Sequence, residues 1–336
     1  MSKKVLIILG NGFSIDFIRY MKCEDRVDVK NLFALGAHVP WPADDRLGFL
    51  SFKHCPNLWN IGARSTMSMA DSLTLIEDVI TCANMLTNTK KASQEKIYLK
   101  AYKELIQYLK ALFIYYDKRI EFSKKKLKTI KEWNWSRYFN KLNSDEGVES
   151  VHVVTFNYDI WLERTLELLG INYNIAGFQN GDQCKFHIYK PHGSISFQSK
   201  IKKEKEAYEI DYTFDIVEDD VSNFDIEYSK ITPLSSINAL IPPAGDSSRF
   251  GFSWAKTISK EIDSMIDNIN SEDELVICGI SYWHVDRLEL DRILGKIPID
   301  VSDVFVLNPS PPRALNAILT TFFDNVINYS GSEYLK

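Results

Sequence analysis

The stretch Val5-Leu6-Ile7-Ile8-Leu9-Gly10-Asn11-Gly12 places five consecutive apolar residues directly before a glycine-rich turn. A strand that is buried on both faces has this continuous apolar pattern, and such strands are typical of parallel sheets. Two glycines at the strand end predict a tight turn, because glycine adopts backbone conformations that other residues avoid. The chain therefore begins like the first strand–turn–helix unit of an α/β protein.

Three later apolar runs repeat this pattern of a strand followed by a helix. The run 151–156 precedes a helical pattern that ends at Gly170, the run 275–279 precedes a helix expected near 285–294, and the run 304–307 precedes a helix expected over 313–323. Strands that alternate with helices predict parallel pairing, because a parallel connection needs a crossover. We therefore expect the α/β class, with a Rossmann-like doubly wound parallel sheet and a helical insertion.

The texture of the sequence changes between Met67 and Leu142. Apolar residues recur there at helical spacing, and glycine does not occur. This pattern predicts two or three long helices. We place them in a helical insertion at 60–148, within a single domain that covers 1–336. The segment 171–240 is strand-like and irregular, and we expect it to contain short strands.

Composition excludes several classes of protein. The chain has 40 Lys and Arg against 45 Asp and Glu, a net charge of −5, which argues against sequence-specific nucleic-acid binding because such proteins usually carry a basic face. Its five cysteines form no CxxC pair, so neither a disulfide framework nor a zinc site is indicated. No apolar run approaches the ~20 residues of a membrane span. We expect a cytoplasmic protein with no metal site.

Polar side chains stand where two of the expected strands end. Asn157 and Asp159 follow one apolar run, and His192 follows another, inside a Pro-His-Gly-Ser turn. Open α/β sheets bind their ligands at the carboxyl ends of parallel strands, and imidazole is well suited to take a proton near pH 7. Asn157 or Asp159 can instead cap the next helix. His152 and His187 lie inside expected strands, and we expect structural roles for them.

The glycine turn and two later strand ends supply candidate nucleotide contacts. Gly10-Asn11-Gly12-Phe13-Ser14 offers glycines and a helix N-terminus to a phosphate. Ile15 stands where a dinucleotide fingerprint has its third glycine, so a plain strand–helix turn remains an alternative. Gly279 and Ser281 follow the third sheet strand, and Asn308 follows the last. Loop or capping roles are the alternatives for these residues.

The chain resembles sirtuin-like domains in the order of five sequence elements, spread from residue 5 to about 325. The elements are Gly10-Asn11-Gly12-Phe13-Ser14, Thr155-Phe156-Asn157-Tyr158-Asp159, Pro191-His192-Gly193-Ser194, Gly279-Ile280-Ser281 and Asn308. The Asn-Tyr-Asp and His-Gly pair is the most specific part. The closest likeness is to the divergent sirtuin-like proteins of prokaryotic anti-phage defence, which hydrolyse NAD to ADP-ribose and nicotinamide.

The resemblance implies roles for individual residues. Gly10, Gly12 and Ser14 would cradle the pyrophosphate, with Asn11 and Phe13 in the same turn. Asn157 would hold the nicotinamide ribose and order the attacking water, and Asp159 would contact the carboxamide. The general base would be His192, followed by Gly193 in the nucleotide site. Gly279, Ser281 and Asn308 would bind the adenosine half.

The chain also departs from the protein-deacylating sirtuins. It lacks their paired CxxC zinc motif, and their longer nucleotide loop is reduced to Ile15-Asp16-Phe17-Ile18-Arg19. The resemblance therefore implies hydrolysis of NAD as substrate, without zinc, rather than acyl-lysine chemistry. Because uncontrolled NAD loss harms the cell, we expect gating by a partner such as a HerA-type ATPase, and a homo-oligomer. The alternatives are a catalytically silent NAD or ADP-ribose sensor, a lysine deacylase, and a scaffold.

Overall fold

The computed structural model describes residues 2–88, 96–123, 125–178, 184–212, 220–235, 237–242, 252–282 and 287–335. The chain divides into two compact units. The sheet unit comprises Met1–Lys22, Glu121–Pro191 and Ala255–Lys336, and the helical unit comprises Cys23–Ile120 and His192–Trp254. The expected insertion at 60–148 and the expected irregular segment at 171–240 therefore each contribute to both units.

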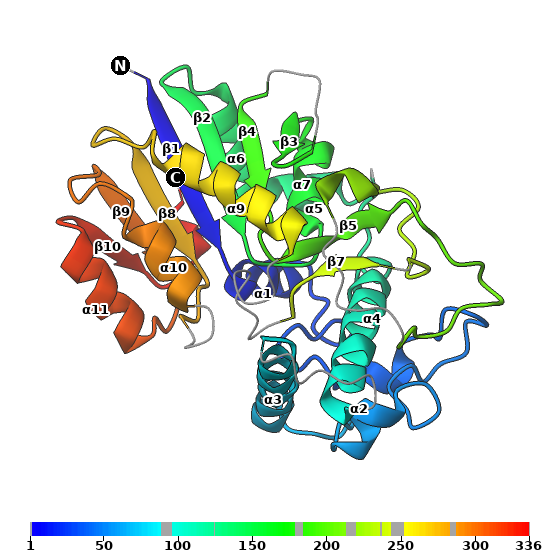
Figure 1. Cartoon of the computed structure of the whole chain (residues 1–336). Coiled ribbons are helices and arrows are strands. Elements are labelled where there is room, and N and C mark those ends of the chain that lie inside the picture. The colour runs from blue at the N-terminus through cyan, green and yellow to red at the C-terminus, as the bar shows by residue number, and fades with distance from the viewer. Residues whose placement is uncertain are drawn as a thin grey trace. The chain divides into compact units, whose positions relative to one another are not determined.

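The sheet unit is built on a seven-stranded sheet with the order β10-β9-β8-β1-β2-β4-β3 (Figure 1). Every neighbouring pair is parallel. The strands are β1 (Lys3–Leu9), β2 (Val148–Thr155), β3 (Tyr173–Ile175), β4 (Phe186–Tyr189), β8 (Glu274–Cys278), β9 (Asp303–Leu307) and β10 (Val326–Tyr329). The predicted α/β class with a doubly wound parallel sheet is confirmed.

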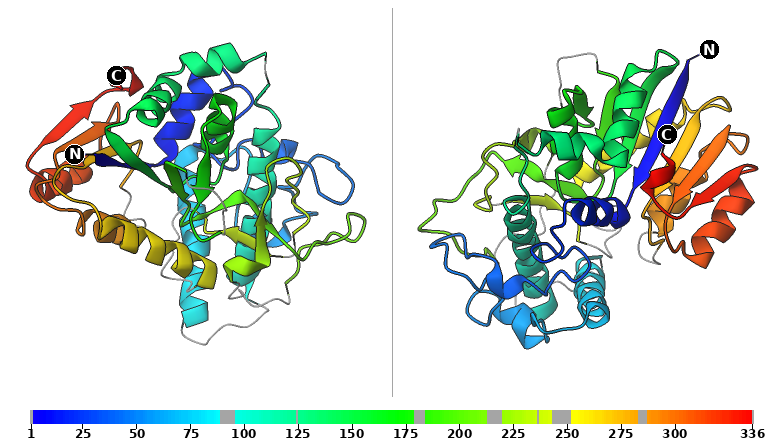
Figure 2. Two further views of the ribbon diagram at one scale, coloured as in Figure 1. Left: turned by 90° about the horizontal axis from the view of Figure 1, so that it is seen from above. Right: turned by 180° about the vertical axis from the view of Figure 1, so that it is seen from behind.

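Helices cover both faces of this sheet, which explains why its central strands are apolar throughout. On one face α6 (Asn134–Ser144) packs against β4, with the Phe139 and Phe186 rings 6.1 Å apart. On the other face lies α9 (Ser253–Ile266), beside α10 (Arg287–Leu294), and Figure 2 shows the sheet between α6 and α9 in its view from above. The ion pair between Arg292 and Asp263 links α10 to α9.

The sheet unit also contains the helices α1 (Asn11–Tyr20), α5 (Leu127–Glu132), α7 (Trp161–Leu169) and α11 (Arg313–Phe322). Helix α7 ends at Gly170, which adopts the left-handed conformation at φ 73° as the predicted C-cap. Helix α1 packs into an aromatic cluster, where the ring centroid of Phe13 lies 5.2 Å from those of both Trp133 and Trp135. That cluster explains why α5 and α6 belong to the sheet unit.

The two halves of the sheet meet between β1 and β8. From β1 the chain continues to β2 on one side, and β8 pairs with β1 on the other. A reversal of strand order of this kind is a topological switch point, outside which doubly wound proteins bind their ligands. Here the Gly12 N–H donates to the Gly279 carbonyl at 3.1 Å, and a Cβ built on Gly12 would lie 2.3 Å from the Gly279 Cα. Only glycine allows this approach.

Among its described residues, the helical unit combines α-helices with a small antiparallel sheet. Its helices are α2 (Pro56–Asn60), α3 (Met69–Asn88) and α4 (Ile97–Asp117), and its sheet has the order β6-β5-β7. Its strands are β5 (Gly193–Ser199), β6 (Phe224–Ile226) and β7 (Asn238–Leu240). The buried Glu104 carboxylate accepts the N–H groups of Asn57 and Leu58, which satisfies the start of α2.

The structure also bears on membrane association. Among the described helices, none combines the length and the apolar character that a bilayer span requires.

Two glycine substitutions separate backbone strain from steric conflict. Gly279 (φ 62°) and Gly170 (φ 73°) are both left-handed, but only Gly279 would bring a Cβ against another backbone, 2.2 Å from the Gly12 Cα. We expect Gly170→Ala to cost about 1 kcal/mol and Gly279→Ala roughly 2 to 4 kcal/mol of unfolding free energy. Urea unfolding of the full chain measures both, and equal losses would contradict the close approach.

Candidate functional site

Three side chains from the ends of β1 and β2 form one hydrogen-bonded chain in the sheet unit. The Ser14 hydroxyl on α1 donates to Asp159 Oδ2 at 2.6 Å, and Asn157 Nδ2 donates to Ser14 Oγ at 3.0 Å. Asn157 Nδ2 also donates to the Gly10 carbonyl at 2.9 Å. Parallel pairing of β1 and β2 brings these ends together, because Leu9 lies opposite Thr155. The structure thus unites residues that are about 145 positions apart in sequence.

The surroundings of Asn157 fix the orientation of its amide. A main-chain carbonyl only accepts hydrogen bonds, so the atom beside the Gly10 carbonyl must be the nitrogen. The side-chain oxygen Oδ1 therefore points elsewhere, and no hydrogen bond is found for it among the described residues. Asn157 is half-buried, whereas Ser14 and Asp159 are buried. Asn157 Oδ1 is therefore the acceptor of this hydrogen-bonded chain that is left for a ligand or a water.

Asp159 is a buried carboxyl group whose proton affinity is unusual. Its pKa is raised to about 6, because burial disfavours the charged form. The Lys190 ammonium and the Ser14 hydroxyl act in the opposite direction, and Glu163 adds to the rise. Asp159 Oδ1 also accepts the Trp161 N–H at 3.2 Å, which satisfies the first turn of α7. The N-cap of α7 is Ile160, and Asp159, one residue earlier, accepts one N–H of the first helical turn and titrates near neutral pH.

Two charged residues complete this site, and the sequence did not single them out. Lys190 follows β4 and donates to Glu163 Oε1 at 2.7 Å and to the Asp159 carbonyl at 2.6 Å. Both side chains are almost fully buried, at 1% and 0% exposure. The available signal was a lone lysine at the end of an apolar strand, together with a glutamate on the apolar side of α7.

Several hydrogen-bond donors of the glycine turn are already paired with other groups of the protein. The Gly12 N–H donates to the Gly279 carbonyl, and the Phe13 N–H donates to the Gly10 carbonyl at 3.1 Å. The Phe13 side chain is buried in the aromatic cluster of α1, and the Ser14 hydroxyl donates to Asp159. Asn11 is exposed at the start of α1. In this conformation, Phe13 and Ser14 thus support the site from inside.

The later strand ends place their candidates at the same edge of the sheet. Gly279 follows β8 at the contact with Gly12, and Ser281 is exposed two residues further on. Asn308, half-buried after β9, donates from Nδ2 to the Ile280 carbonyl at 3.3 Å and accepts the Ser310 N–H at 3.1 Å. These residues border the switch point, but Asn308 already acts as a local loop cap.

His192 and Gly193 lie in the helical unit, at the start of β5. The His192 side chain is buried, and its carbonyl accepts the Ile241 N–H at 3.0 Å. Gly193 has φ 81°, and a Cβ there would lie 1.9 Å from the Ala239 carbonyl oxygen, so β7 requires a glycine at this position. Along the chain, His192 comes two residues after Lys190.

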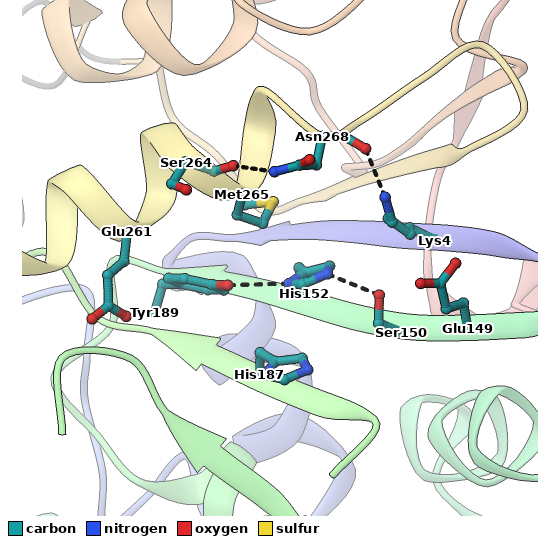
Figure 3. Close-up of a pocket in the computed structure, with 10 residues that line it drawn as sticks. All are labelled: Lys4, Glu149, Ser150, His152, His187, Tyr189, Glu261, Ser264, Met265 and Asn268. Carbon is teal, nitrogen blue, oxygen red and sulfur yellow. Dashed lines mark hydrogen bonds between the residues drawn. The ribbon is translucent and has the colours of Figure 1, made fainter. Parts of the chain in front are cut away.

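A pocket of about 490 Å³ lies between α9 and the strands β1, β2 and β4 (Figure 3). The His152 and His187 rings stack side by side on adjacent strands, with centroids 5.0 Å apart. The other lining residues are Lys4, Glu149, Ser150, Tyr189, Glu261, Ser264, Met265 and Asn268. This pocket is lined by strand faces rather than by the strand-end residues of the candidate site.

His152 in this pocket joins a serine and a tyrosine. Its ring nitrogens lie 2.9 Å from Ser150 Oγ and 3.1 Å from Tyr189 Oη (Figure 3). A nucleophile, a base and an orienting group have this connectivity in hydrolases. Burial, His187 and Lys4 lower the pKa of His152 to about 3, however, and a base that weak takes a serine proton poorly near neutral pH. The structural role expected for His152 therefore fits the geometry better.

Metal ligands and known relatives add no further assignment. Within the described ranges, His, Cys, Asp and Glu side chains do not gather in a group of three or more that could hold a metal ion. No protein-family model matches the chain, and no curated protein matches it. The sirtuin-like resemblance thus stays a prediction from the sequence.

The raised pKa of Asp159 predicts a stability contribution that depends on pH. An unfolded Asp titrates near 3.8 and the folded one near 6, so this group stabilises the fold below pH 3.8 and loses that stabilisation as the pH rises to 6. We expect wild type to lose about 2 kcal/mol relative to Asp159→Asn between pH 4.5 and 7. Urea unfolding of both proteins at the two pH values tests this. An equal change of unfolding free energy in wild type and Asp159→Asn would contradict it.

The lowered pKa of His152 predicts that stability depends on pH in the opposite direction. Its folded pKa of about 3 lies below the unfolded value of 6.5, so its stabilisation is complete above pH 6.5 and is lost as the pH falls. Relative to His152→Gln, wild type should lose about 2 kcal/mol of unfolding free energy between pH 8 and pH 5. A matched series with the exposed His38→Gln controls for the replacement of a histidine as such. A titration of the His152 ring by NMR near pH 6.5 would refute the prediction.

Proposed function

We propose that this protein is an NAD⁺ hydrolase that converts NAD to ADP-ribose and nicotinamide. The observation that carries the proposal is the hydrogen-bonded chain of Asn157, Ser14 and Asp159 beside the switch point of the sheet. It unites two of the five sequence elements that carry the sirtuin-like resemblance, the glycine turn 10–14 and the element 155–159. The half-buried amide oxygen of Asn157 supplies a hydrogen-bond acceptor at the carboxyl ends of β1 and β2.

The proposed reaction assigns a role to each residue of the site. Cleavage of the C1′–N bond creates positive charge on the ribose, which nearby oxygen dipoles and carboxylates stabilise. Asn157 Oδ1 would order the attacking water, and the ionised Asp159 would accept the carboxamide N–H of nicotinamide. His192 would take the proton of the ribose hydroxyl as general base. Gly279, Ser281 and Asn308 would bind the adenosine half.

The cellular role is part of the same proposal. Depletion of NAD in the cytoplasm would stop the growth of an infected cell, which suits abortive infection as an anti-phage defence. Such an enzyme must stay silent until infection, so a partner protein such as a HerA-type ATPase would release its activity. We further propose that the chain works as a homo-oligomer. Lysine deacylation is disfavoured because the sequence lacks the CxxC pairs of deacylating sirtuins.

The alternative function is a catalytically silent NAD or ADP-ribose sensor, which would use the same turn as its phosphate site. The Gly12 and Phe13 N–H groups and the Ser14 hydroxyl all donate to other protein groups. A phosphate at the start of α1 would have to compete for these donors. A sensor predicts saturable nucleotide binding without products, whereas a hydrolase predicts release of nicotinamide.

The test is an assay of the full chain, alone and with its partner ATPase, with NAD as substrate. We expect His192→Ala to lower the rate of nicotinamide release by roughly 10²–10⁴-fold, because a general base contributes about that much. Asn157→Ala should lower it by a similar factor through loss of the ordered water. His38→Ala and Asn143→Ala, both at exposed positions, are the matched controls and should keep the wild-type rate.

Three results would decide between the alternatives. Nicotinamide release that both site variants lack supports the hydrolase. Calorimetric binding of ADP-ribose with no product in the assembled complex supports the sensor instead. An undiminished rate in His192→Ala removes the imidazole from the mechanism.

A further inference from the structure

We propose that Lys190 is a positioning residue, which holds the turn 156–160 in the conformation that presents Asn157 and Asp159 to the nucleotide. The identity of the nucleotide rests on the proposed function, whereas the contacts of Lys190 do not. Lys190 belongs to the strand end of β4, two strands away from β1. It would act through the turn, without touching the substrate.

The turn 156–160 is held from two sides. At its start, the Phe156 N–H donates to the Leu9 carbonyl of β1 at 3.0 Å. At its end, the Lys190 ammonium donates to the Asp159 carbonyl at 2.6 Å. Asn157 lies between these two anchors and is irregular in backbone. Removal of the Lys190 contact would therefore free one end of the segment that carries both polar side chains.

Glu163 fixes the Lys190 ammonium in turn. Its Oε1 accepts from Lys190 Nζ at 2.7 Å, and both side chains are almost fully buried. The second oxygen, Glu163 Oε2, is buried without a hydrogen-bond partner among the described residues. A buried ion pair with one unbonded oxygen contributes little net stability to a core, because apolar residues of similar volume often stabilise it equally well. A role in placing the turn accounts for its presence.

Lys190 and Glu163 also influence the charge state of Asp159. The Lys190 ammonium pairs with the Glu163 carboxylate and reaches Asp159 through the main-chain carbonyl. Lys190 lowers the pKa of Asp159 and Glu163 raises it. Without the cation, Asp159 would hold its proton to higher pH and would lose an acceptor for the carboxamide N–H. Lys190 would thus control both the place and the protonation of one site residue.

The experiment compares three variants of the full chain with wild type. Lys190→Met alone leaves the buried Glu163 unpaired and is expected to fold poorly. The double variant Lys190→Met/Glu163→Gln removes both charges, and Glu163→Gln alone keeps the cation. Lys185→Met is the matched control, since the half-buried Lys185 likewise donates to main-chain carbonyls, those of Asn143 and Asp145, but has no buried carboxylate partner among its hydrogen bonds to them.

Two readouts are needed because they fail separately. The first is the titration of the Asp159 carboxyl carbon by NMR, assigned with Asp159→Asn. The second is the rate of NAD hydrolysis, resolved into kcat and KM across pH. We expect Glu163→Gln to shift the Asp159 titration down and the double variant to shift it up, because Lys190 affects the Asp159 pKa more than Glu163 does. The kcat of the double variant should fall on the order of 10²-fold, as for a misplaced reacting group.

Each result has a defined meaning. An Asp159 titration that is the same in wild type, both charge variants and Lys185→Met overturns the inference, whether or not NAD is consumed. A shifted titration with an unchanged kcat and pH profile also overturns it, because the ion pair would then be only structural. A shifted titration in a wild type that binds ADP-ribose and releases no nicotinamide overturns the proposed hydrolase and leaves the control of Asp159 by Lys190 in place.

Discussion

The contact between Gly12 and Gly279 is the constraint on which the sheet unit depends. It brings the turn after β1 against the end of β8, with backbone atoms so close that a Cβ on either residue would collide with the other. Because β1 lies between β8 and β2, this contact also fixes where α1 starts relative to the end of β2. Ser14 can reach Asp159 only because α1 starts there. The hydrogen-bonded chain is therefore a consequence of a backbone contact.

Charge burial is the second theme of the sheet unit. Asp159, Glu163 and Lys190 lie together in the interior, and the half-buried His152 lies elsewhere with a lowered pKa. Burial raises the pKa of the acid and lowers that of the imidazole, so the two groups respond to pH in opposite directions. Their contributions partly cancel in the wild-type protein. A flat dependence of its stability on pH would thus conceal two strongly perturbed groups.

Much of the sheet could be predicted from the sequence, because its central strands carry a strong pattern. The apolar runs in β1, β2, β8 and β9 are continuous, and Gly170 ends α7 where its pattern stops. The division into units could not be predicted. The helical periodicity of 67–142 is unbroken, yet α4 and α6 join different bodies. Periodicity shows that a helix has an apolar face but not which partner covers it.

The candidate site was predictable in part. Strand-end logic places Asn157, Asp159 and the glycine turn together, and the structure does bring them into contact. It assigns Phe13 and Ser14 to the interior, where the sequence suggested ligand contacts. Lys190 and Glu163 escaped notice because a pair formed by a strand end and a helix has no fixed spacing. Residue types alone do not reveal a buried ion pair.

The sheet order also constrains how the protein is made. Val5 of β1 lies opposite Glu274 of β8, so the central strand receives one neighbour only after most of the chain has left the ribosome. At about 5–20 residues per second, synthesis of that intervening length takes roughly 10 to 50 s. During this time one edge of the apolar strand is open to pairing with other chains. The first strand therefore lacks one of its two neighbours until β8 (Glu274–Cys278) has been synthesised.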